Sequence, residues 1–330
     1  MLLFDNVITT ALWGYTMQLS DRIGRRLKLQ DLHVLMTVVE AGSMGKAAEQ
    51  LNTVQPAISR SIAEVEHALG VRLLDRHRQG VEPTECGRVL LDCGTAVFDE
   101  LRQGMKKIEF LADPATGEAR VGGHPFLNAT FGCAVIDRLS RRYPRIAVHL
   151  TAGPEEDVYR KLSDRNLDLL ITRRFGPIDE RFEFESLFDE SPLLVAAGAR
   201  SPWARRRRIE LAELVNESWV LPLPSGPIGS VAMEAFRASG LAYPRRTVFV
   251  DTAEGRINLL ASGRFLTILA RSTLRFSTGR PKFKVLPVEL PSSPVLVGIV
   301  TLKNRTLSPV ARLFIEHARE VAKPLAKKKG

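Results

Sequence analysis

The sequence predicts a multidomain α+β protein, and three observations support this. The chain has 330 residues, which is long for a single compact core. Its first third carries helical patterns of apolar residues, whereas from about residue 118 strand-like and helical segments alternate, as in α/β units on a mainly parallel sheet. Hydrophobic residues make up 45% and charged residues 25%, with a mean hydropathy of -0.04, as in ordinary soluble globular proteins.

Three helices are predicted between residues 27 and 70. The first ends at Ala41 and Gly42, where its apolar periodicity stops. Ser43 is placed to cap a short second helix. The third has apolar positions four, three and four residues apart, which form one stripe: Ile58, Ile62, Val65 and Leu69. We therefore expect three helices around a small core.

The third helix carries a short polar face near its start. Gln55 and Ser59 are four residues apart, as are Pro56 and Arg60, so all four share the exposed side. Pro56 is tolerated there because the N-H groups of a first helical turn are unpaired. Two helices joined by a tight turn predict a helix-turn-helix, in which Gln can bond adenine and Arg can bond guanine in the major groove. For an isolated motif, a solvated face of a three-helix bundle is an equally good interpretation.

A wing and a long helix follow. Leu73, Leu74, a Gln79-Gly80 turn signal and Pro83 predict two short strands with a basic edge. Thr84 can cap a helix that reaches about Leu111. Its apolar residues have near-heptad spacing: Leu90, Val97, Leu101 and Ile108. A helix of roughly 40 Å cannot bury such a stripe alone, so we expect a partner helix, with Gly94 and Gly104 on the same seam.

The rest of the chain predicts two α/β lobes. The stretch "ADPATGEA", residues 112–119, is interpreted as a linker because it contains Pro and Gly between patterned segments. We assign residues 118–190 and 293–323 to lobe I, and 191–292 to lobe II. Residues 1–26 are an N-terminal extension, 27–84 the winged helix-turn-helix, 85–111 the long helix and 324–330 a basic tail.

The net charge of +10 and pI of about 9.8 favour polyanionic partners. Cys86, Cys93 and Cys133 have neither metal-ligand nor disulfide spacing, which predicts partly buried free thiols in a reducing, cytoplasmic compartment. No apolar run is long enough to span a bilayer. The first residues lack a basic n-region and a cleavage pattern, so we expect no signal peptide, and Met17 is an alternative start to Met1.

The run "LHVLMTVVEAGSMGKAAEQLNTVQPAISRSIAEVEHALGVRLLDRHRQGVEPTECGRVLL" resembles the amino-terminal region of LysR-type transcriptional regulators, and the resemblance extends over about Leu27 to Lys323. It implies a winged helix-turn-helix, a dimerising linker helix and a two-lobed domain resembling type 2 periplasmic binding proteins. By position, it implies major-groove contacts from Gln55, Pro56, Ser59 and Arg60. Phosphate contacts are implied for Ser43 and Arg76.

Two features depart from this family pattern. Val54 stands where such regulators commonly have Ser or Thr at the start of the recognition helix. We therefore expect Thr53 or Asn52 to cap that helix instead. The extension before Leu27 is also longer than is usual in the family, which supports Met17 as an alternative start.

The resemblance implies that a small effector binds between the lobes. In α/β sheets, ligands gather at the carboxyl ends of strands, near helix N-termini. Loops with this position contain the candidate effector-binding residues Pro125, Phe126, Leu127, Asn128, Thr151, Ser225, Gly226, Ile228, Asp251 and Thr252. His124 is interpreted as a loop or packing residue in preference to a ligand contact. For Arg173 and Arg174, contact with an anionic effector and simple solvation both stay open. The basic runs Arg205 to Arg208 and Lys327 to Lys329 are interpreted as solvated.

The sequence therefore predicts a sequence-specific DNA-binding transcriptional regulator that responds to a small effector, with an architectural DNA-binding protein of limited sequence preference as the alternative. Two α/β lobes argue against the alternative, because it gives them no task. No hydrolase elbow, HExxH, P-loop or Rossmann fingerprint is present in a suitable context, so we expect neither an enzyme nor a cofactor. Expected partners are double-stranded operator DNA, a second copy in a homodimer or homotetramer, and RNA polymerase as a further candidate. The stretch "SWVLPLPSGPIGS" resembles regulators related to the galactose-binding-protein regulator, which implies a sugar or a small organic acid as the effector, and we expect no membrane partner.

Overall fold

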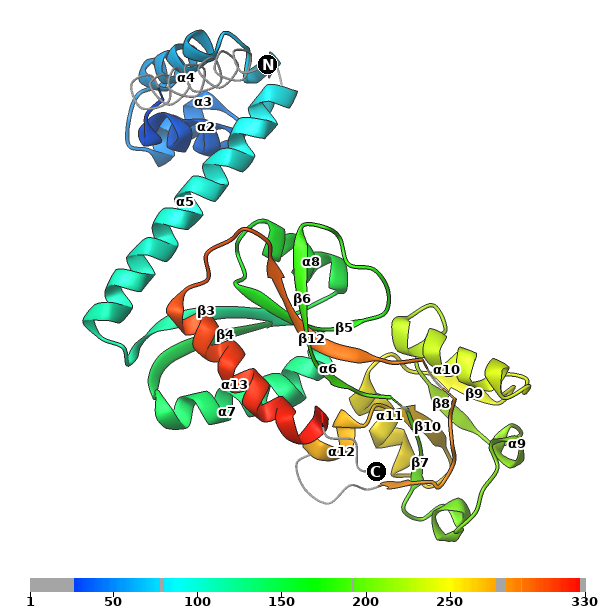
Figure 1. Cartoon of the computed structure of the whole chain (residues 1–330). Helices are drawn as coiled ribbons and strands as arrows, with labels where there is room; N and C mark the ends of the chain where they lie inside the picture. Colours follow the sequence, from blue (N-terminus) through cyan, green and yellow to red (C-terminus); the bar gives the residue numbers. More distant parts are fainter. Residues whose placement is uncertain (1–26, 78–79, 192, 277–282, 292, 327–330) are drawn as a thin grey trace, which may run out of the picture. The chain divides into compact units, whose positions relative to one another are not determined.

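Figure 1 shows the structure, a computed structural model that describes residues 27–77, 80–191, 193–276, 283–291 and 293–326. The chain forms two compact units, residues 1–102 and 103–330, each of which is described by itself. Three sequence predictions lie outside the described residues: the extension before residue 27 with its alternative start, the Gln79 half of the wing turn, and the tail lysines 327–329.

The described part of the N-terminal unit begins with three helices: α2 (Leu29–Ala41), α3 (Met44–Gln50) and α4 (Gln55–Leu69). Ile58, Ile62 and Val65 of α4 are at most 2% exposed, and they pack against side chains of α2 and α3. Ser43 caps α3 as predicted, because its Oγ accepts a hydrogen bond from the Lys46 N-H at 3.1 Å. The predicted three-helix core is therefore present.

The predicted cap of α4 is wrong. Val54 occupies the N-cap position and makes no side-chain hydrogen bond there. Asn52 has a left-handed backbone, with φ of 49°, and the Thr53 N-H donates to the Ala48 carbonyl at 2.9 Å. Both residues are thus committed to the turn that ends α3. The first N-H groups of α4 are consequently left without a side-chain cap.

The wing consists of β1 (Leu74–His77) and β2 (Gly80–Pro83), which pair antiparallel. The Val81 N-H donates to the Gly42 carbonyl at 3.0 Å, so β2 lies against the turn between α2 and α3. Gly80 has φ of 145°, and a Cβ there would lie 2.7 Å from the Gly42 oxygen. Only glycine suits this position. The predicted wing is therefore present and is fixed to the helix-turn-helix.

The long helix α5 (Glu85–Ala112) has 28 residues and begins after Thr84, whose Oγ1 accepts from the Gly87 N-H at 3.0 Å. Two residues predicted on its unpartnered seam lie elsewhere. A Cβ on Gly94 would meet Met36 Sδ at 3.1 Å, and Leu90 packs against the core of the helix-turn-helix. The large apolar residues of α5 that remain exposed are Val89, Val97, Leu101, Met105, Ile108 and Leu111.

The linker after α5 is shorter than predicted. α5 ends at Ala112 and β3 (Thr116–Gly123) begins four residues later, so most of the expected linker belongs to regular structure. Asp113 makes the turn: its Oδ1 accepts from the Ala115 N-H at 3.1 Å and its carbonyl from the Thr116 N-H at 3.2 Å. These bonds form a tight turn within the stretch that was predicted as a linker.

The first lobe is built on a five-stranded sheet of order β4-β3-β5-β12-β6. The other strands are β4 (Arg145–Ala152), β5 (Leu169–Arg174), β6 (Phe182–Asp189) and β12 (Leu296–Leu302). Helices α7 (Cys133–Arg142) and α13 (Pro309–Ala326) pack on one face, and α8 (Glu155–Ser163) on the other (Figure 1). A short helical segment, α6 (Pro125–Leu127) and η1 (Asn128–Gly132), joins β3 to α7.

The second lobe is built on another five-stranded sheet, of order β11-β7-β10-β8-β9. Its strands are β7 (Leu194–Gly198), β8 (Trp219–Leu221), β9 (Thr247–Phe249), β10 (Leu266–Leu269) and β11 (Phe283–Val285). Its helical segments are η2 (Pro202–Arg205), α9 (Leu211–Leu214), α10 (Pro227–Ala238), α11 (Ala253–Leu260) and α12 (Ser272–Phe276). The core centres on Trp219 and Phe236, whose rings meet edge to face at 5.4 Å.

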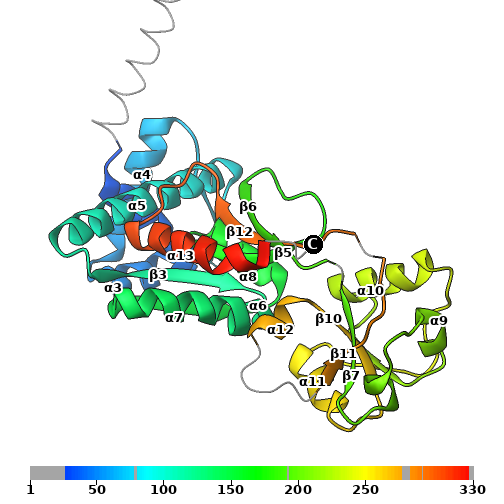
Figure 2. The same cartoon turned by 60° about the horizontal axis from the view of Figure 1, so that its bottom comes forward.

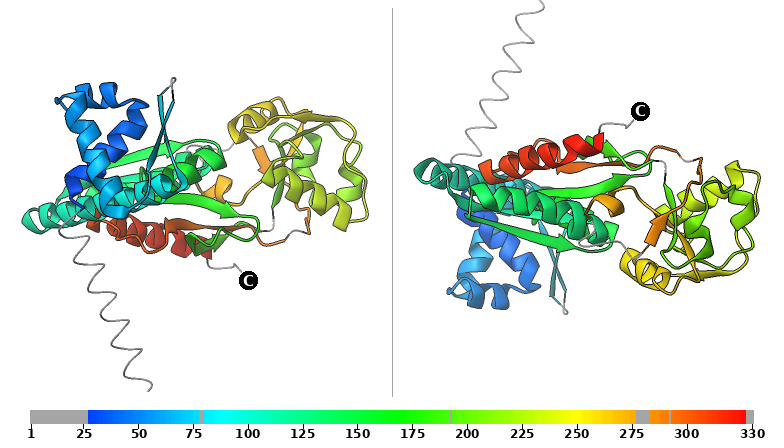
Figure 3. Two further views of the ribbon diagram at one scale, coloured as in Figure 1. Left: turned by 90° about the horizontal axis from the view of Figure 1, so that it is seen from above. Right: turned by 90° about the horizontal axis from the view of Figure 1, so that it is seen from below.

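In each sheet four strands run in the same direction, in line with the mainly parallel arrangement predicted, and one strand runs opposite to them. In the first, β4, β3 and β5 pair parallel, and β12 pairs antiparallel with β5 and β6. In the second, β10 and β9 pair parallel with β8, while β7 pairs antiparallel with β10 and β11. The reversed strands are β7 and β12, which are the strands that the chain enters when it crosses between the lobes, from β6 to β7 and from β11 to β12 (Figures 2 and 3). The alternating pattern could not reveal that these crossings reverse strand direction.

The three cysteines are free and exposed, not partly buried as predicted. Cys86 and Cys93 lie on α5, and Cys133 is the first residue of α7. The helical periodicity around them left their orientation undetermined. No helix within the described ranges combines the length and apolar character that a membrane crossing requires.

Candidate functional site

The exposed polar face of α4 is the first candidate site. Gln55, Pro56 and Arg60 are exposed and Ser59 is half-buried. The opposite side of the helix is fixed by its buried stripe and by the Ser61 hydroxyl, which donates to Asp31 Oδ1 of α2 at 2.9 Å. A rigid underside with short, non-acidic side chains on top is the form that a major-groove reader requires.

The two predicted phosphate contacts lie in the same unit as this face. Ser43 is at the start of α3, with its Oγ engaged by the Lys46 N-H. Its own hydroxyl hydrogen is still available to an outside acceptor. Arg76 is exposed on β1, opposite Val81. Its neighbour Arg72 is instead paired with Asp75 at 3.3 Å, which leaves Arg76 as the better candidate cation of the wing.

The second candidate site is a cleft within residues 103–330, which we call the inter-lobe cleft. It encloses about 880 Å³ of space, part of which is open solvent. The first lobe contributes its walls from the ends of β3, β4 and β5, and the second lobe from the starts of α10, α11 and α12. The lining residues are His124, Phe126, Gly153, Glu155, Val158, Thr172, Arg173, Phe175, Pro222, Gly226, Pro227, Ile228, Gly229, Asp251, Ala253, Arg256, Leu269, Ala270 and Thr273.

Two helix N-termini of the second lobe open into the cleft. α10 begins at Pro227, so the backbone N-H groups of Ile228 and Gly229 have no intrahelical acceptor. α11 begins at Ala253 after Thr252, whose Oγ1 accepts from the Gly255 N-H at 3.3 Å. Both N-termini carry a partial positive charge that favours an anion.

A buried polar cluster links the cleft to the crossing between the lobes. Arg173 of β5 is 6% exposed, and its Nε and Nη2 donate to Glu190 at 2.5 and 3.4 Å. Glu190 is fully buried just after β6 and also accepts a hydrogen bond from the Ser272 hydroxyl at the start of α12. The Arg173 guanidinium also lies over the Phe126 ring. One carboxylate therefore joins residues of both lobes.

Arg256 is the second buried arginine of the cleft. It is 6% exposed, and its Nη1 donates to the carbonyls of Val250 and Asp251, both at 2.8 Å. Its Nε has no hydrogen-bond partner within the described part of the chain. Burial lowers the pKa of Arg256, while the nearby carboxylates of Asp251 and Glu254 act in the opposite direction. A buried guanidinium with an unpartnered Nε favours an anionic ligand.

Two further titratable groups line the walls. His124 has much of its surface exposed, yet loss of hydration at its ring and the positive charge of Arg173 lower its pKa. Its Nδ1 accepts from the Phe126 N-H at 3.3 Å, so the neutral ring caps α6. Loss of hydration raises the pKa of Glu155 at the start of α8. The lining residues that the structure describes place no cysteine or serine nucleophile beside either group.

The predicted effector-binding residues fall into two groups. Phe126, Gly226, Ile228 and Asp251 line the cleft, whereas Pro125, Asn128, Thr151, Ser225 and Thr252 do not. Leu127 was predicted on the wall, but it is 0% exposed and packs in the core with α7 and α13. A segment as short as α6 has too few residues for its periodicity to reveal which side faces the core.

Some lining residues were not predicted. His124, interpreted as a packing residue, is a wall residue that also caps a helix. For Arg173 and Arg174, effector contact and solvation were both left open. Arg173 lines the cleft, whereas Arg174 is exposed beside the Phe184 ring. Arg256 and Glu155 were missed. An arginine in the first turn of a helix that follows a strand was a signal for Arg256.

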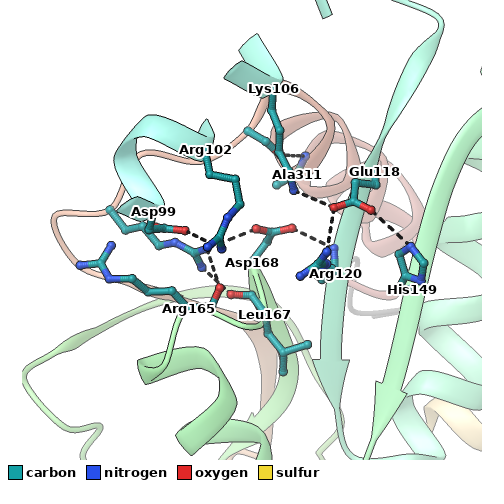
Figure 4. A network of polar contacts seen from close by, with 12 residues as sticks. Asp99, Arg102, Lys106, Glu118, Arg120, His149, Arg165, Leu167, Asp168 and Ala311 are labelled. Carbon is teal, nitrogen blue, oxygen red and sulfur yellow. Dashed lines mark hydrogen bonds and ion pairs between the residues drawn. The ribbon is translucent and has the colours of Figure 1, made fainter. Parts of the chain in front are cut away.

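A polar network connects the end of α5 to the first lobe (Figure 4). Glu118 of β3 lies 3.1 Å from Lys106 of α5, 3.1 Å from Arg120 and 3.5 Å from His149 of β4. Burial by itself raises the pKa of Glu118, but these positive groups outweigh that effect and the pKa is lowered. The network fixes the last turns of α5 to β3 within the C-terminal unit.

No group of three or more metal-ligating side chains occurs in the ranges that the structure describes.

Comparison with protein families identifies the chain's class. The model described as "LysR substrate binding domain" matches residues 112–323, more than half of the chain, and the model described as "Bacterial regulatory helix-turn-helix protein, lysR family" matches residues 29–88. The chain belongs to the LysR family. The predicted family and fold class are therefore confirmed.

Relatives of this LysR-family chain are transcriptional regulators. It is 26% identical to the HTH-type transcriptional regulator TdcA of Escherichia coli over 294 residues, which cover 89% of this chain and 93% of the relative. It is 28% identical to the transcriptional dual regulator GltC of Bacillus subtilis, with 88% and 96% covered. GbpR of Azospirillum brasilense is 25% identical, with 89% and 86% covered.

Solved structures share the fold of this LysR-family chain. A full-length OxyR variant from Pseudomonas aeruginosa has a TM-score of 0.63 at 22% identity, with 92% of this chain and 99% of that chain covered. CbnR complexed with its target DNA has a TM-score of 0.53 at 22% identity, with 90% and 100% covered. The chain is thus a DNA-binding transcriptional regulator of the LysR family with a substrate-binding domain.

Proposed function

We propose that this LysR-family regulator reads a specific DNA operator with α4 and that a small effector bound in the inter-lobe cleft controls this activity. The observation that carries the first part is the polar face of α4. Gln55 and Arg60 are exposed on one side, while Ile58 and Ile62 on the other are at most 2% exposed. Packing therefore holds Gln55 and Arg60 outward, as direct readout of base edges requires.

We further propose that the predicted linker helix, residues 85–111, joins two copies of the chain. Six large apolar side chains of α5 are 40% to 72% exposed on a single chain, among them Leu101, Met105 and Ile108. An exposed apolar stripe of this kind marks a protein interface. Dimerisation would place two α4 helices on successive half-sites, and a homotetramer would double this arrangement.

The proposed boundaries of 118–190 and 293–323 for lobe I, and of 191–292 for lobe II, are supported by the two sheets and their crossing connections. The inter-lobe cleft lies where these two parts meet, and Glu190 at the crossing contacts both Arg173 and Ser272. A ligand with different affinity for open and closed lobes would shift their populations. Glu190 is the residue through which that shift would reach the crossing. The described walls of the cleft contain no cysteine or serine beside His124 or Glu155, which favours a regulatory role of the cleft over a catalytic one.

Two matched substitutions test the DNA-reading role. Replacing Arg60 with Ala should reduce affinity for the selected operator by about 1 to 3 kcal/mol and relax the choice at one base pair. Replacing Arg76 with Ala should weaken operator and random duplexes alike and flatten the salt dependence by a slope of roughly 0.9. Both are measured by fluorescence anisotropy at several salt concentrations.

Equal losses on operator and random DNA for Arg60→Ala would contradict base readout by α4. The family assignment would stand, and the architectural alternative with limited sequence preference would then describe the binding better.

A further inference from the structure

The donor edge of Arg256 determines what the inter-lobe cleft can bind. A guanidinium offers a flat edge, formed by Nε and Nη2, that matches the two oxygens of a carboxylate. In Arg256 the other nitrogen, Nη1, is held by the Val250 and Asp251 carbonyls, and these two bonds fix the plane of the group. The Nε is unpartnered among the described residues, in a residue that is only 6% exposed.

The surroundings of Arg256 provide further donors. Ile228 and Gly229 present backbone N-H groups at the start of α10, a helix of 12 residues, and Ala253 does so at the start of α11. Arg173 also lines the cleft, close enough for its charge to act on Arg256. Its Nε and Nη2 are used by Glu190, so Arg173 contributes positive potential more than free donors.

The remaining walls are mainly apolar. Phe126, Val158 and Phe175 come from the first lobe, and Pro222, Ile228 and Leu269 from the second. The described lining residues include no Asn, Gln, Trp or Tyr. A sugar would bury several hydroxyl groups, each of which needs a polar partner, and these apolar side chains supply none. A hydrocarbon group needs none.

Acidic side chains limit the charge of the ligand. Asp251 and Glu155 also line the cleft, and Glu254 lies near Arg256. All three are exposed, so water weakens their interaction with the buried guanidinium, although the charges of Asp251 and Glu254 still act on the pKa of Arg256. A second negative charge placed toward them would nevertheless be repelled.

We propose that the inter-lobe cleft binds a small molecule with a single carboxylate and a hydrocarbon body, and that the carboxylate docks on the Nε and Nη2 edge of Arg256. This inference rests on the proposed effector role of the cleft and names the chemical class of the effector. The α10 and α11 N-termini complete the anion site, and the apolar walls hold the hydrocarbon part.

The test uses the full-length protein and matched pairs of compounds. Hexanoate, benzoate and phenylacetate are each compared with the corresponding primary amide, and glutarate and galactose are added as a dicarboxylate and a sugar. Thermal unfolding with and without each compound reports binding by mass action. We expect at least one monocarboxylate to raise the melting temperature, with its amide, glutarate and galactose giving no comparable shift.

Three variants locate the binding. Arg256→Gln should weaken the effective carboxylate about 10- to 100-fold, and Arg256→Lys, which keeps the charge and loses the flat edge, about tenfold. Arg237→Gln is the matched control, because Arg237 lies on α10 in the same lobe and is paired with exposed Glu234. It should bind as the wild type does. The unliganded melting temperature and circular dichroism of each variant verify folding.

Three outcomes would overturn the inference: no monocarboxylate raises the melting temperature, an amide or galactose binds as well as the acid, or folded Arg256→Gln and Arg256→Lys bind the acid unchanged. Operator selectivity, measured separately on the same preparation, distinguishes this failure from failure of the proposed function. Selective DNA binding without carboxylate binding would refute only the ligand class, and the reverse result would refute only DNA readout.

Discussion

Replacing Glu190 with Gln tests how the two lobes are held together. Glu190 is 0% exposed and accepts hydrogen bonds from Arg173 Nε at 2.5 Å, from Arg173 Nη2 at 3.4 Å and from the Ser272 hydroxyl. The substitution removes the charge but not the volume, and leaves a guanidinium that is 6% exposed without its counter-charge. Breaking a buried ion pair in this way costs about 3 to 5 kcal/mol.

A second ion pair in the first lobe, which is exposed, provides the control. Glu185 and Arg319 form a bidentate pair whose side chains are 39% and 52% exposed. Glu185→Gln should therefore cost at most about 1 kcal/mol. Urea unfolding is followed by tryptophan fluorescence, to which Trp219, buried in the second lobe, contributes. A Glu190→Gln protein no less stable than Glu185→Gln would refute the assignment of the buried pair as a link between the lobes.

Three further predictions concern other parts of the chain. Ile62→Ala should destabilise the helix-turn-helix by about 2 to 5 kcal/mol because Ile62 is 0% exposed, whereas Leu69→Ala, at 46% exposure, should cost far less; thermal unfolding compares them. Ile108→Glu should shift the assembly toward monomers in sedimentation experiments, since it places a charge on the exposed stripe of α5, and an unchanged mass would exclude that stripe as the interface. Because the folded-state pKa of His124 is lowered, the wild type should lose stability relative to His124→Gln as the pH falls through the ordinary histidine value of about 6.5. If the difference in the free energy of unfolding between the two proteins stayed constant across that pH range, the lowered pKa would be contradicted.

Local patterns predicted the elements of the N-terminal unit well. The Ser43 and Thr84 caps, the buried stripe of α4 and the wing all follow from short-range chemistry, namely hydrogen bonds and periodicities that span a few residues. The prediction of the α4 cap was wrong because Asn52 has a left-handed backbone, which the packing of the preceding turn determines. The prediction that Gly94 lies on the exposed seam was also wrong, because Gly94 lies against Met36, which is far away in the sequence.

The cleft could be predicted only in part. Phe126, Gly226 and Ile228 were found because ligands gather where strands lead into helices, a rule that sequence order can express. The cluster of Arg173 and Glu190 could not be found in this way, because it forms where segments cross between two sheets. Predicting the role of Arg256 would have required knowing that its Nη1 donates to backbone carbonyls while its Nε has no partner among the described residues. Such facts depend on tertiary packing, which no local pattern contains.

The central claim is that packing holds Gln55 and Arg60 on an outward face that reads base edges. Selection of random duplexes by the full-length protein, followed by sequencing, tests it most directly. We predict an enriched motif of two half-sites about one helical turn apart, or a multiple of it, which is lost at defined base pairs for Gln55→Ala and Arg60→Ala. Recovery of sequences without a shared motif by the folded wild-type protein, or the same motif from both variants, would contradict the claim.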